Sequence, residues 1–378
     1  MKIAILGTRG IPARYGGFET FAEQIATHLA ARGHHVTVYC RKAFTRPGDT
    51  VAPGVRRVIL PSINSKNFDT LFHSLLSTLH VLFTDVDIVL MCNVANSIYA
   101  WMPRLFGKPT ILNVDGLDRK RDKWSAFGRA FLHLCEIVSV ATPSVVVTDA
   151  HVIQRYYQER YRKSTRMIAY GAEVKLATGP LVPYSLTAGN YFLYVSRLEP
   201  ENSPELVIRA YRELDTDWPL VVVGDNVYRP DYVRSLKAIA DPRVIFTGSI
   251  YGDGYWLLQN NAGMYISGCR VGGTHPALIE SMAAGNAVLY LQTPESDEVT
   301  RGCAIPFHDD PAHLAAQMAR LLRDPQLRAE LGKRARHVVA EHYSWQSITQ
   351  QYEDLCHELL RGPKAEPTPT ERPRREAA

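Results

Sequence analysis

The sequence alternates short apolar runs with amphipathic segments, and this alternation constrains the fold more than any other feature. In the first half, the apolar runs have the length of buried parallel strands, and the segments between them repeat apolar residues with helical spacing. Strands are expected at 2–7, 35–40, 87–93 and 109–116, and helices at 18–29, 68–83 and 126–139. This order of elements predicts a parallel sheet that is doubly wound.

The alternation stops at 174–190 and then starts again. This segment has no clear periodicity and contains two glycines and two prolines, so it is expected to link two domains. Further strands are expected at 191–196, 219–225, 243–249, 263–267 and 287–292, and helices at 203–214, 230–240, 252–261 and 275–284. The sequence therefore predicts an α/β protein of two Rossmann-like doubly wound domains. Because open sheets bind ligands at the carboxyl ends of their strands, the cleft between the domains is the expected active site.

The domain boundaries follow from the same pattern. A chain of 378 residues is long enough for two hydrophobic cores. The first domain is expected at 1–175 and the second at 188–342, and residues 311–361 have helical patterns. The tail 362–378 holds four prolines, four basic residues and three acids with nothing to bury, so we expect it to be disordered.

Composition and motif content argue against several classes of protein. The formal net charge of +5 suits phosphorylated ligands or an anionic membrane surface, and it is too small for a nucleic-acid footprint. The six cysteines are far apart and form no C-x-x-C pair, which favours reduced thiols in a cytoplasmic protein over a zinc site or disulfides. Without an H-x-E or H-E-x-x-H motif, no bound metal or other cofactor is expected. No apolar run reaches the ~18 residues of a membrane span.

Glycines crowd the turn after the first strand, in the segment GTRGIPARYGGFETF. Gly16 and Gly17 let the backbone approach a ligand, and the free N–H groups of the following helix favour an anion or a hydroxyl-rich group. Arg9 and Arg14 add positive charge. The spacing differs from G-x-G-x-x-G, so a dinucleotide fingerprint fits poorly. An ordinary tight turn with surface arginines is the alternative.

The strongest local signal is the strand-to-helix turn in VGGTHPALIESMAAGNAV, residues 271–288. Gly272, Gly273 and Thr274 offer backbone N–H groups at the start of a helix, where a phosphate or a sugar is favoured. Glu280 lies about one turn into this helix and can accept hydrogen bonds from two neighbouring hydroxyls, as on a ribose. The alternative is a capped core helix with a solvated glutamate.

Two more residues are candidates for a phosphate contact. His275 begins the same helix and can touch a phosphate or act as the helix cap. Arg197 follows the first strand of the second half and can grip a diphosphate with two hydrogen bonds. As a surface residue it would instead pair with Glu199 or Glu201.

The segment NVDGLDRKRDKW follows a strand of the first half. Asp115 and Asp118 are candidates for contacts to hydroxyls or to a base. Close behind them, a basic-aromatic cluster can bind a lipid phosphate or a membrane surface, and a solvated helix start is the alternative. The cluster consists of Arg119, Lys120, Arg121, Lys123, Trp124 and Phe127.

These motifs resemble a known family. KIAILGTRGIPARYGGFETF, YFLYVSRLEPEN, GGTHPALIESMAAGN and TPESDEV are similar to bacterial glycosyltransferases of the family 4 type, most of all to a rhamnosyltransferase-like subgroup of polysaccharide biosynthesis, over residues 1 to about 361. The resemblance implies a GT-B fold with a nucleotide-sugar donor in the C-terminal domain and an acceptor in the N-terminal domain. It also implies retention at the anomeric carbon without a bound metal, and a C-terminal helix, 343–361, that packs back on the N-terminal domain.

By position, the resemblance implies roles for individual residues. Arg197 would bind the donor diphosphate, and Glu280 would match the ribose-binding second glutamate of an E-x7-E motif. Gly272 stands in place of the first glutamate and Asn202 in place of a lysine, so Arg270 is a candidate for the missing positive charge. Arg197 and Glu280 are the expected catalytic residues. The expected donor site is Arg197, Arg270, Gly272, Gly273, Thr274, His275 and Glu280, and the expected acceptor site is Arg9, Arg14, Gly16, Gly17, Asp115 and Asp118.

The expected function is transfer of a sugar from a nucleotide-diphosphate sugar to a saccharide. By the resemblance, the acceptor is carried on a polyprenyl diphosphate, and the enzyme touches the inner leaflet of the membrane. Three alternatives stay open. An epimerase would turn over a nucleotide sugar without an acceptor, an oxidoreductase would have to bind NAD, and an inactive homologue would bind glycan without nucleotide.

Overall fold

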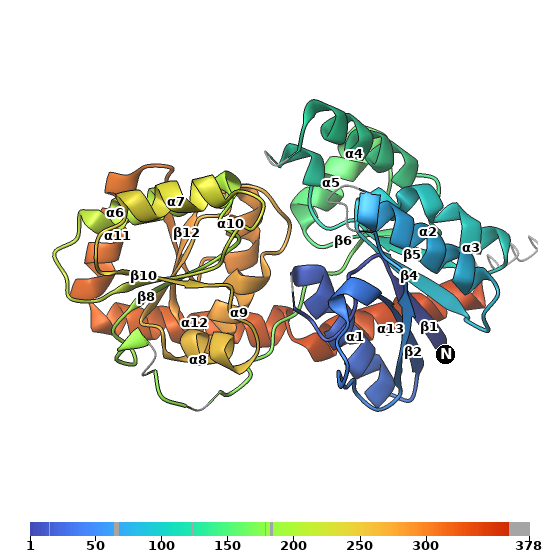
Figure 1. The fold of residues 1–378 in the computed structure, drawn as a ribbon, viewed down its shortest axis with the longest axis horizontal. Helices are drawn as coiled ribbons and strands as arrows, with labels where there is room; N and C mark the ends of the chain where they lie inside the picture. Colours follow the sequence, from blue (N-terminus) through green and yellow to red (C-terminus); the bar gives the residue numbers. More distant parts are fainter. Residues whose placement is uncertain (15, 64–67, 122–123, 178, 182–183, 363–378) are drawn as a thin grey trace, which may run out of the picture.

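A computed structural model describes residues 1–14, 16–63, 68–121, 124–177, 179–181 and 184–362 (Figure 1). The strands of this part of the chain form two separate sheets, one in each half, and helices flank both. All the pairs between named strands are parallel. The prediction of two doubly wound α/β domains is confirmed.

The N-terminal sheet has the strand order β3-β2-β1-β4-β5-β6-β7. Its strands are β1 Lys2–Leu6, β2 His35–Arg41, β3 Val55–Leu60, β4 Ile88–Cys92, β5 Thr110–Asn113, β6 Val145–Thr148 and β7 Arg166–Met167. The α-helices of this half are α1 Gly17–Ala31, α2 Phe68–Leu82, α3 Trp101–Leu105, α4 Ala126–Ser139 and α5 His151–Tyr161. The order reverses between β1 and β4, which is where open sheets of this kind leave a crevice for a ligand.

The C-terminal sheet repeats this topology with the order β10-β9-β8-β11-β12-β13. Its strands are β8 Phe192–Val195, β9 Leu220–Val223, β10 Val244–Gly248, β11 Met264–Ser267, β12 Ala287–Leu291 and β13 Ile305–Phe307. The helices are α6 Pro204–Arg212, α7 Pro230–Ile239, α8 Asp253–Asn261, α9 Pro276–Ala284, α10 Pro294–Thr300, α11 Pro311–Arg323, α12 Pro325–His342 and α13 Trp345–Arg361. Here the order reverses between β8 and β11, so α9 starts beside the crevice.

Strand β1 illustrates how one sheet supports two cores. Ile3 and Ile5 pack with residues of α1 and α13, whereas Ala4 and Leu6 pack with residues of α2, α4 and α5. All four side chains are at most 1% exposed. Because alternate side chains of a strand point to opposite faces, a strand that is buried on both faces is apolar throughout.

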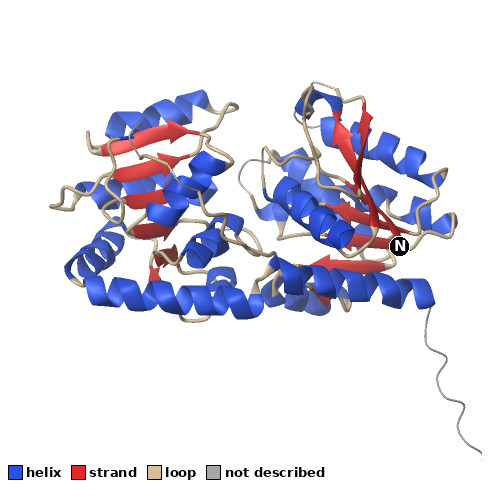
Figure 2. Ribbon diagram, turned by 90° about the horizontal axis from the view of Figure 1, so that it is seen from below, coloured by secondary structure: helices blue, strands red, loops and turns tan. Residues whose placement is uncertain are grey.

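The last helix returns from the C-terminal domain to the N-terminal domain. Together α12 and α13 run along both domains (Figure 2), and α13 packs against α1. The ring centroids of Tyr352 and Phe21 lie 5.3 Å apart in this contact. At the start of α13, Trp345 lies against Gly171, where a Cβ would come within 2.6 Å of the indole. A side chain at position 171 would therefore block the crossing.

Four strands were not expected from the sequence: β3, β6, β13 and β7, which has two residues. β3 is partly exposed and contains Arg56 and Arg57, and β13 has three residues including Pro306, so neither offers a continuous apolar run. β6 has only four residues. Most of the tail that is predicted to be disordered, 363–378, lies outside the described residues.

Candidate active site

A cleft of about 510 Å³ lies between the two domains, at the carboxyl ends of both sheets. Its lining includes most of the residues predicted for the site. From the N-terminal domain these are Arg9, Gly16, Gly17, Asp115 and Asp118, and from the C-terminal domain Arg197, Gly272, Gly273, Thr274 and His275. Three predicted residues, Arg14, Arg270 and Glu280, do not line the cleft.

The segment Gly272 to Thr274, here called the glycine corner, precedes α9 and faces the N-terminal domain. The Thr274 N–H donates to a carboxylate oxygen of Asp149 at 2.6 Å, and the Thr274 hydroxyl donates to the Asp149 carbonyl at 2.7 Å. A Cβ on Gly273 would lie 2.0 Å from the Asp149 carboxylate. A Cβ on Gly116 would lie 2.6 Å from the carbonyl carbon of Gly272. The bare backbone of the corner therefore makes room for the other domain.

Asp149 and Asp115 follow the neighbouring strands β6 and β5, and their carboxyl groups interact. Asp149 is 6% exposed, and burial raises the pKa of its carboxyl well above the usual value, with a further increase from Asp115. One Asp149 oxygen accepts the Thr274 N–H, and the other is buried beside Asp115. A proton held by Asp149 lets this second oxygen donate a hydrogen bond to Asp115.

Arg197 stands on the C-terminal side of the cleft, just after β8. Its side chain is exposed, and within the described residues it has no ion pair. The two glutamates considered as its partners lie near other arginines. Arg229 is 3.7 Å from Glu199, and Arg121 is 3.9 Å from Glu201. The guanidinium of Arg197 is therefore available to an anion in the cleft.

The basic-aromatic cluster near residue 120 does not form a continuous surface. Arg121 lines the cleft, and its Nε lies 2.7 Å from Asp118. Burial alone would lower the pKa of Arg121, but nearby carboxylates, above all Asp118, raise it. Arg119 turns elsewhere and donates to Glu136 at 2.9 Å. Lys123 lies outside the described residues.

On the N-terminal side, Arg9 and the glycine loop border the cleft. Glu19 is 6% exposed and accepts the Arg9 N–H at 2.9 Å, and burial raises the pKa of this carboxyl. The Arg9 guanidinium stands over the ring of Phe44, 4.9 Å from its centroid. A Cβ on Gly17 would lie 3.0 Å from Pro276 of α9, so this loop also faces the other domain.

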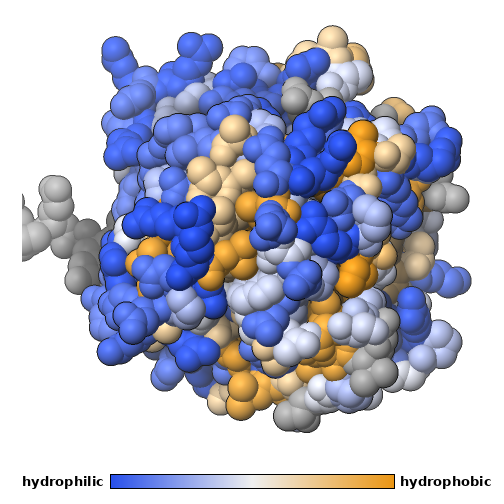
Figure 3. Space-filling model, turned by 90° about the vertical axis from the view of Figure 1, so that its left-hand side faces the viewer, coloured by the Kyte–Doolittle hydropathy of each residue, from blue (hydrophilic) through white to orange (hydrophobic). Residues whose placement is uncertain are grey.

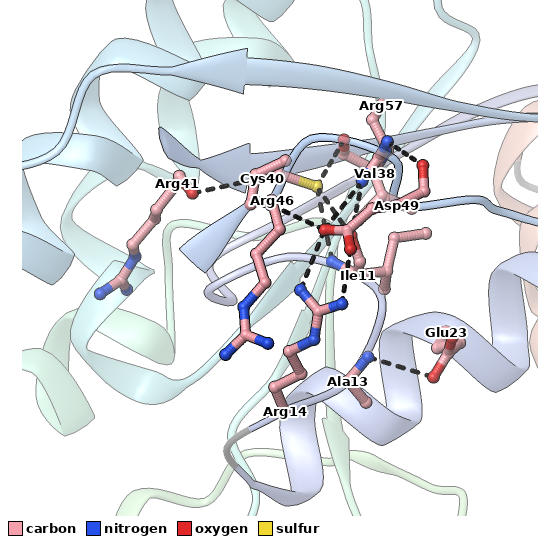
Figure 4. A network of polar contacts seen from close by, with 11 residues as sticks. Ile11, Ala13, Arg14, Glu23, Val38, Cys40, Arg41, Arg46, Asp49 and Arg57 are labelled. Carbon is pink, nitrogen blue, oxygen red and sulfur yellow. Dashed lines mark hydrogen bonds and ion pairs between the residues drawn. The ribbon is translucent and has the colours of Figure 1, made fainter. Parts of the chain in front are cut away.

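Arg14 does not line the cleft and belongs to a polar network of the N-terminal domain (Figure 4). Its guanidinium donates twice to the Asp49 carboxylate, at 3.0 and 2.5 Å. The Arg46 N–H adds a hydrogen bond at 2.8 Å, and these bonds lower the pKa of Asp49 to about 2. In this structure, Arg14 therefore joins two loops of the domain.

Arg270 and Glu280 are also engaged outside the cleft. The Arg270 guanidinium contacts both carboxylate oxygens of Asp309, and its Nε donates to the Ser203 hydroxyl at 2.8 Å. The Glu280 carboxylate accepts a hydrogen bond from the Tyr255 hydroxyl, and burial raises the pKa of Glu280. Neither side chain lines the cleft beside the glycine corner.

Several residues of the cleft were not predicted. Tyr228 and Tyr251, 51% and 50% exposed, line its C-terminal side. Asp149 follows a strand end just as Asp115 does, so recognising the short strand 145–148 would have revealed it. The sequence places Arg121 in a cluster that binds a lipid phosphate or a membrane surface or forms a solvated helix start, because it does not indicate which way the side chain points.

Cys269 differs from the other five cysteines, which are buried. It lines the cleft beside His275. Burial, the largest single influence, raises the pKa of the Cys269 thiol, but His275, Arg121 and the Val271 backbone together lower it below the usual value. The Cys269 thiol donates to the Asn202 side-chain carbonyl at 3.3 Å, and the Asn202 amide donates to the Arg197 carbonyl at 2.8 Å. A buried amide thus fills the position that the resemblance gives to a lysine.

Two kinds of feature are absent from the described residues. In this part of the chain, no helix combines the length and apolar character needed to cross a bilayer. In the same residues, no group of three or more His, Cys, Asp and Glu side chains is placed to hold a metal ion.

Both halves of the chain match models of glycosyltransferase domains. Residues 15–175 match the model described as Glycosyltransferase Family 4, and residues 185–338 match the one described as Glycosyl transferases group 1. Each domain is therefore a glycosyltransferase domain, and the class of enzyme that the matches support is a transferase.

Curated relatives match part of the chain. An uncharacterized glycosyltransferase of Methanocaldococcus jannaschii is 25% identical over 180 residues, which are 44% of this chain and 45% of that protein. The N-acetyl-alpha-D-glucosaminyl L-malate synthase of Bacillus anthracis is 25% identical over 187 residues, 46% of each chain. The match thus spans less than half the length of these relatives.

Solved structures match nearly the whole chain. A sucrose-phosphate synthase from Thermosynechococcus elongatus superposes with a TM-score of 0.81 at 21% identity, covering 96% of this chain and 100% of that one. The Anabaena protein HepE, solved in complex with UDP-glucose, gives a TM-score of 0.72 at 16% identity, covering 94% and 99%. At these identities the likeness shows the fold, and it confirms the predicted GT-B architecture.

Proposed function

We propose that the protein is a retaining glycosyltransferase that moves a sugar, rhamnose by the resemblance, from a nucleoside diphosphate sugar to a saccharide. The observation that carries this proposal is the exposed guanidinium of Arg197, which shares a cleft between two glycosyltransferase domains with the glycine corner. HepE has the same fold and was solved with UDP-glucose, which supports a nucleotide sugar as the donor class.

The donor diphosphate would lie between Arg197 and the glycine corner. A guanidinium can donate two parallel hydrogen bonds to phosphate oxygens. The backbone N–H groups at the start of α9 add partial positive charge. Asp149 accepts the Thr274 N–H in the structure, so a phosphate oxygen would replace this carboxylate as the donor enters.

These groups would stabilise the negative charge that grows on the leaving phosphate as the glycosidic bond breaks. Loss of one such group typically costs ~3 kcal/mol, which is roughly a hundredfold in rate. The acceptor hydroxyl would attack from the face that the phosphate leaves, and the leaving phosphate would accept the hydroxyl proton. The sugar then keeps its anomeric configuration, and neither a protein nucleophile nor a bound metal is needed.

Three side chains would hold the nucleoside. Glu280 does not line the cleft in the structure, so its carboxylate would have to give up the hydrogen bond from Tyr255 and turn toward the cleft to reach the hydroxyls of the ribose. Tyr228 and Tyr251 offer aromatic surface on the same side of the cleft, on which a base can stack.

The acceptor would bind on the N-terminal side of the cleft. Asp115 and Asp118 can accept hydrogen bonds from sugar hydroxyls, and Gly16 and Gly17 allow close approach. Arg9 would face the diphosphate of a polyprenyl carrier. Such an acceptor, in the synthesis of a cell-surface polysaccharide, would require this cytoplasmic enzyme to work at the inner leaflet.

One surface of the N-terminal domain suits contact with a membrane. More than half of the exposed large hydrophobic side chains in the described chain lie on or next to α2, α3 and α4: Phe68, Phe72, Leu79, Phe83, Trp101, Leu105, Phe106, Phe127, Leu134 and Ile137. Arg104 and Arg129 are exposed on the same helices and would attract anionic lipid. Figure 3 shows the outer face of the C-terminal domain, where hydrophilic residues surround the hydrophobic areas.

Vesicle binding tests this surface. The wild type should sediment with vesicles of phosphatidylglycerol and phosphatidylcholine, and less with phosphatidylcholine alone. The double change Phe127→Glu, Leu134→Glu should reduce sedimentation, whereas Ile59→Glu on β3 should not. Concentration-dependent dimers without vesicle binding would assign the surface to a second copy of the chain.

Turnover of nucleotide sugars tests the proposed function. Purified protein is first screened by thermal shift against thymidine-, uridine-, guanosine- and adenosine-linked sugars, since a ligand of the native state raises the melting temperature. Release of nucleoside diphosphate is then measured with and without saccharide acceptors, and it should depend on both the acceptor and Arg197. Turnover without any acceptor would favour an epimerase, and glycan binding without nucleotide binding would favour an inactive homologue.

A further inference from the structure

We infer that Arg121, a residue of the N-terminal domain, is a second ligand of the donor diphosphate, opposite Arg197 of the C-terminal domain. This inference rests on the proposed function and adds a residue that closes the site from the other side of the cleft.

The position of Arg121 supports this role. Its loop lies against the glycine corner, because a Cβ on Gly116 would come within 2.6 Å of the Gly272 carbonyl carbon. Arg121 lines the cleft, and its NH1 group lies 3.9 Å from the Glu201 carboxylate of the other domain. Its charge also acts on the pKa of His275, the residue that follows the corner. The guanidinium is therefore on the N-terminal side of the place where the diphosphate is expected.

Three other arginines at or near the cleft contact different groups in the described structure, although Arg9 and Arg41 also line the cleft. Arg41 is 3% exposed and donates to Asp69 at 2.7 Å. Arg9 stands over the ring of Phe44. Arg270 pairs with Asp309 and does not line the cleft. In the described part of the chain, Arg121 is the arginine of the N-terminal domain that lies beside the glycine corner.

Arg121 has carboxylates on both sides but keeps donors available for a further anion. Its Nε lies 2.7 Å from Asp118, whereas the contact to Glu201 is looser, at 3.9 Å. A guanidinium has five N–H donors in a planar fork, so it can keep the Asp118 contact and still donate to a phosphate oxygen. A diphosphate held by Arg121 and Arg197 would bridge the two domains, which couples donor binding to closure of the cleft.

Nucleotide binding by variants tests the inference. The probes are UDP, dTDP, GDP and ADP, titrated by calorimetry into the full-length protein, with the matching nucleosides as controls. Arg121→Ala should weaken nucleoside diphosphate binding by about ten- to a hundredfold, the usual effect of losing a hydrogen bond between charged groups. It should leave binding of the nucleoside nearly unchanged. Arg121→Lys keeps the charge and should restore part of the loss.

Lys120→Ala is the matched control, because Lys120 is an exposed cation on the same loop and does not line the cleft. Arg197→Ala reports on the proposed donor site itself. If the wild type binds a diphosphate and Arg197→Ala weakens it, while Arg121→Ala behaves like Lys120→Ala, the inference is wrong and the proposed function stands. If the wild type binds no nucleotide at all, both the proposed function and the inference about Arg121 are wrong. Unfolding curves identify an Arg121→Ala protein that fails to fold, and Arg121→Lys then decides the question.

Discussion

The carboxylate of Asp149, in the N-terminal domain, accepts the backbone N–H of Thr274, in the C-terminal domain, at 2.6 Å. In a second contact between the domains, the accepting carboxylate belongs to the C-terminal domain. Glu298 of α10 accepts the N–H groups of His151 and Val152 at the start of α5, at 2.6 and 2.9 Å. Each domain therefore supplies a carboxylate that satisfies free N–H groups at a helix start of the other, which is favourable for both helices.

The pH dependence of stability should depend on Asp149. The pKa of this carboxyl is raised well above its unfolded value by burial and by Asp115, so the folded state holds the proton more tightly. Its contribution to stability is fully present below the unfolded pKa of about 4 and is lost as the pH rises through the folded pKa. Asp149→Asn cannot titrate, yet its side-chain oxygen can still accept the Thr274 N–H.

We therefore expect the melting temperature of Asp149→Asn to fall less than that of the wild type between about pH 4 and pH 8. Differential scanning fluorimetry across this range measures the slope. Asp215→Asn, a change of an exposed aspartate in the other domain, is the control and should follow the wild type. Equal slopes for all three proteins would mean that Asp149 does not titrate differently in the folded state.

Glu298→Ala should lower stability by removing the cap of α5. Loss of a side chain that accepts N–H groups at a helix start typically costs ~1 kcal/mol. The cost here falls on the contact between the domains, because α5 and α10 belong to different domains. Urea unfolding measures the change, and Glu295→Ala on the same helix is the control. An unchanged midpoint for Glu298→Ala would show that water replaces the carboxylate at no cost.

The sequence indicates which residues lie at the ligand-binding edge of each sheet more reliably than it indicates which way their side chains point. Strand and helix spacing are local signals, and a residue just after a parallel strand must lie at the ligand-binding edge of the sheet. This is why the sequence puts Arg197, Asp115 and the glycine corner at the edge where the cleft lies. The same rule would have found Asp149 if the four-residue strand before it had been recognised.

The residues placed elsewhere have partners that are far away in the sequence. Arg14 pairs with Asp49, which lies 35 residues later, and Arg270 pairs with Asp309, 39 residues later. Neither partner carries a pattern that marks it in advance. The sequence predicts that Gly272 and Gly273 offer N–H groups to a phosphate or a sugar, whereas in the structure the group packed against Gly273 is the Asp149 carboxylate of the other domain.

The pair of Arg14 and Asp49 should support folding of the N-terminal domain in acid. The pKa of Asp49 is lowered to about 2, first of all by its hydrogen bonds from Arg14. A lowered folded pKa gives stability that is present above the unfolded value near 4 and is lost as the pH falls toward 2. Arg14→Ala should thus unfold at a higher pH during acid titration, followed by circular dichroism, while nucleotide binding at pH 7 stays unchanged. A change in nucleotide affinity in Arg14→Ala would instead show that Arg14 contributes to the ligand site.

Gly273→Ala should separate the two domains near the cleft. The added Cβ would lie 2.0 Å from the Asp149 carboxylate, a distance that real atoms do not tolerate, so one side of the contact must move. We expect a larger radius of gyration by X-ray scattering and a strong loss of glycosyl transfer. Gly179→Ala is the control, because its Cβ would meet only a leucine methyl group at 3.9 Å.

A double variant identifies the source of this clash. Asp149→Ala removes the carboxylate that the new Cβ would meet, so Gly273→Ala combined with Asp149→Ala should be more compact than Gly273→Ala alone. The two changes should be strongly non-additive, as expected for residues in direct contact. If the effects of the two changes on the radius of gyration simply add, the contact with Asp149 does not explain why position 273 needs a glycine. A ligand or the backbone of the glycine corner would then require it.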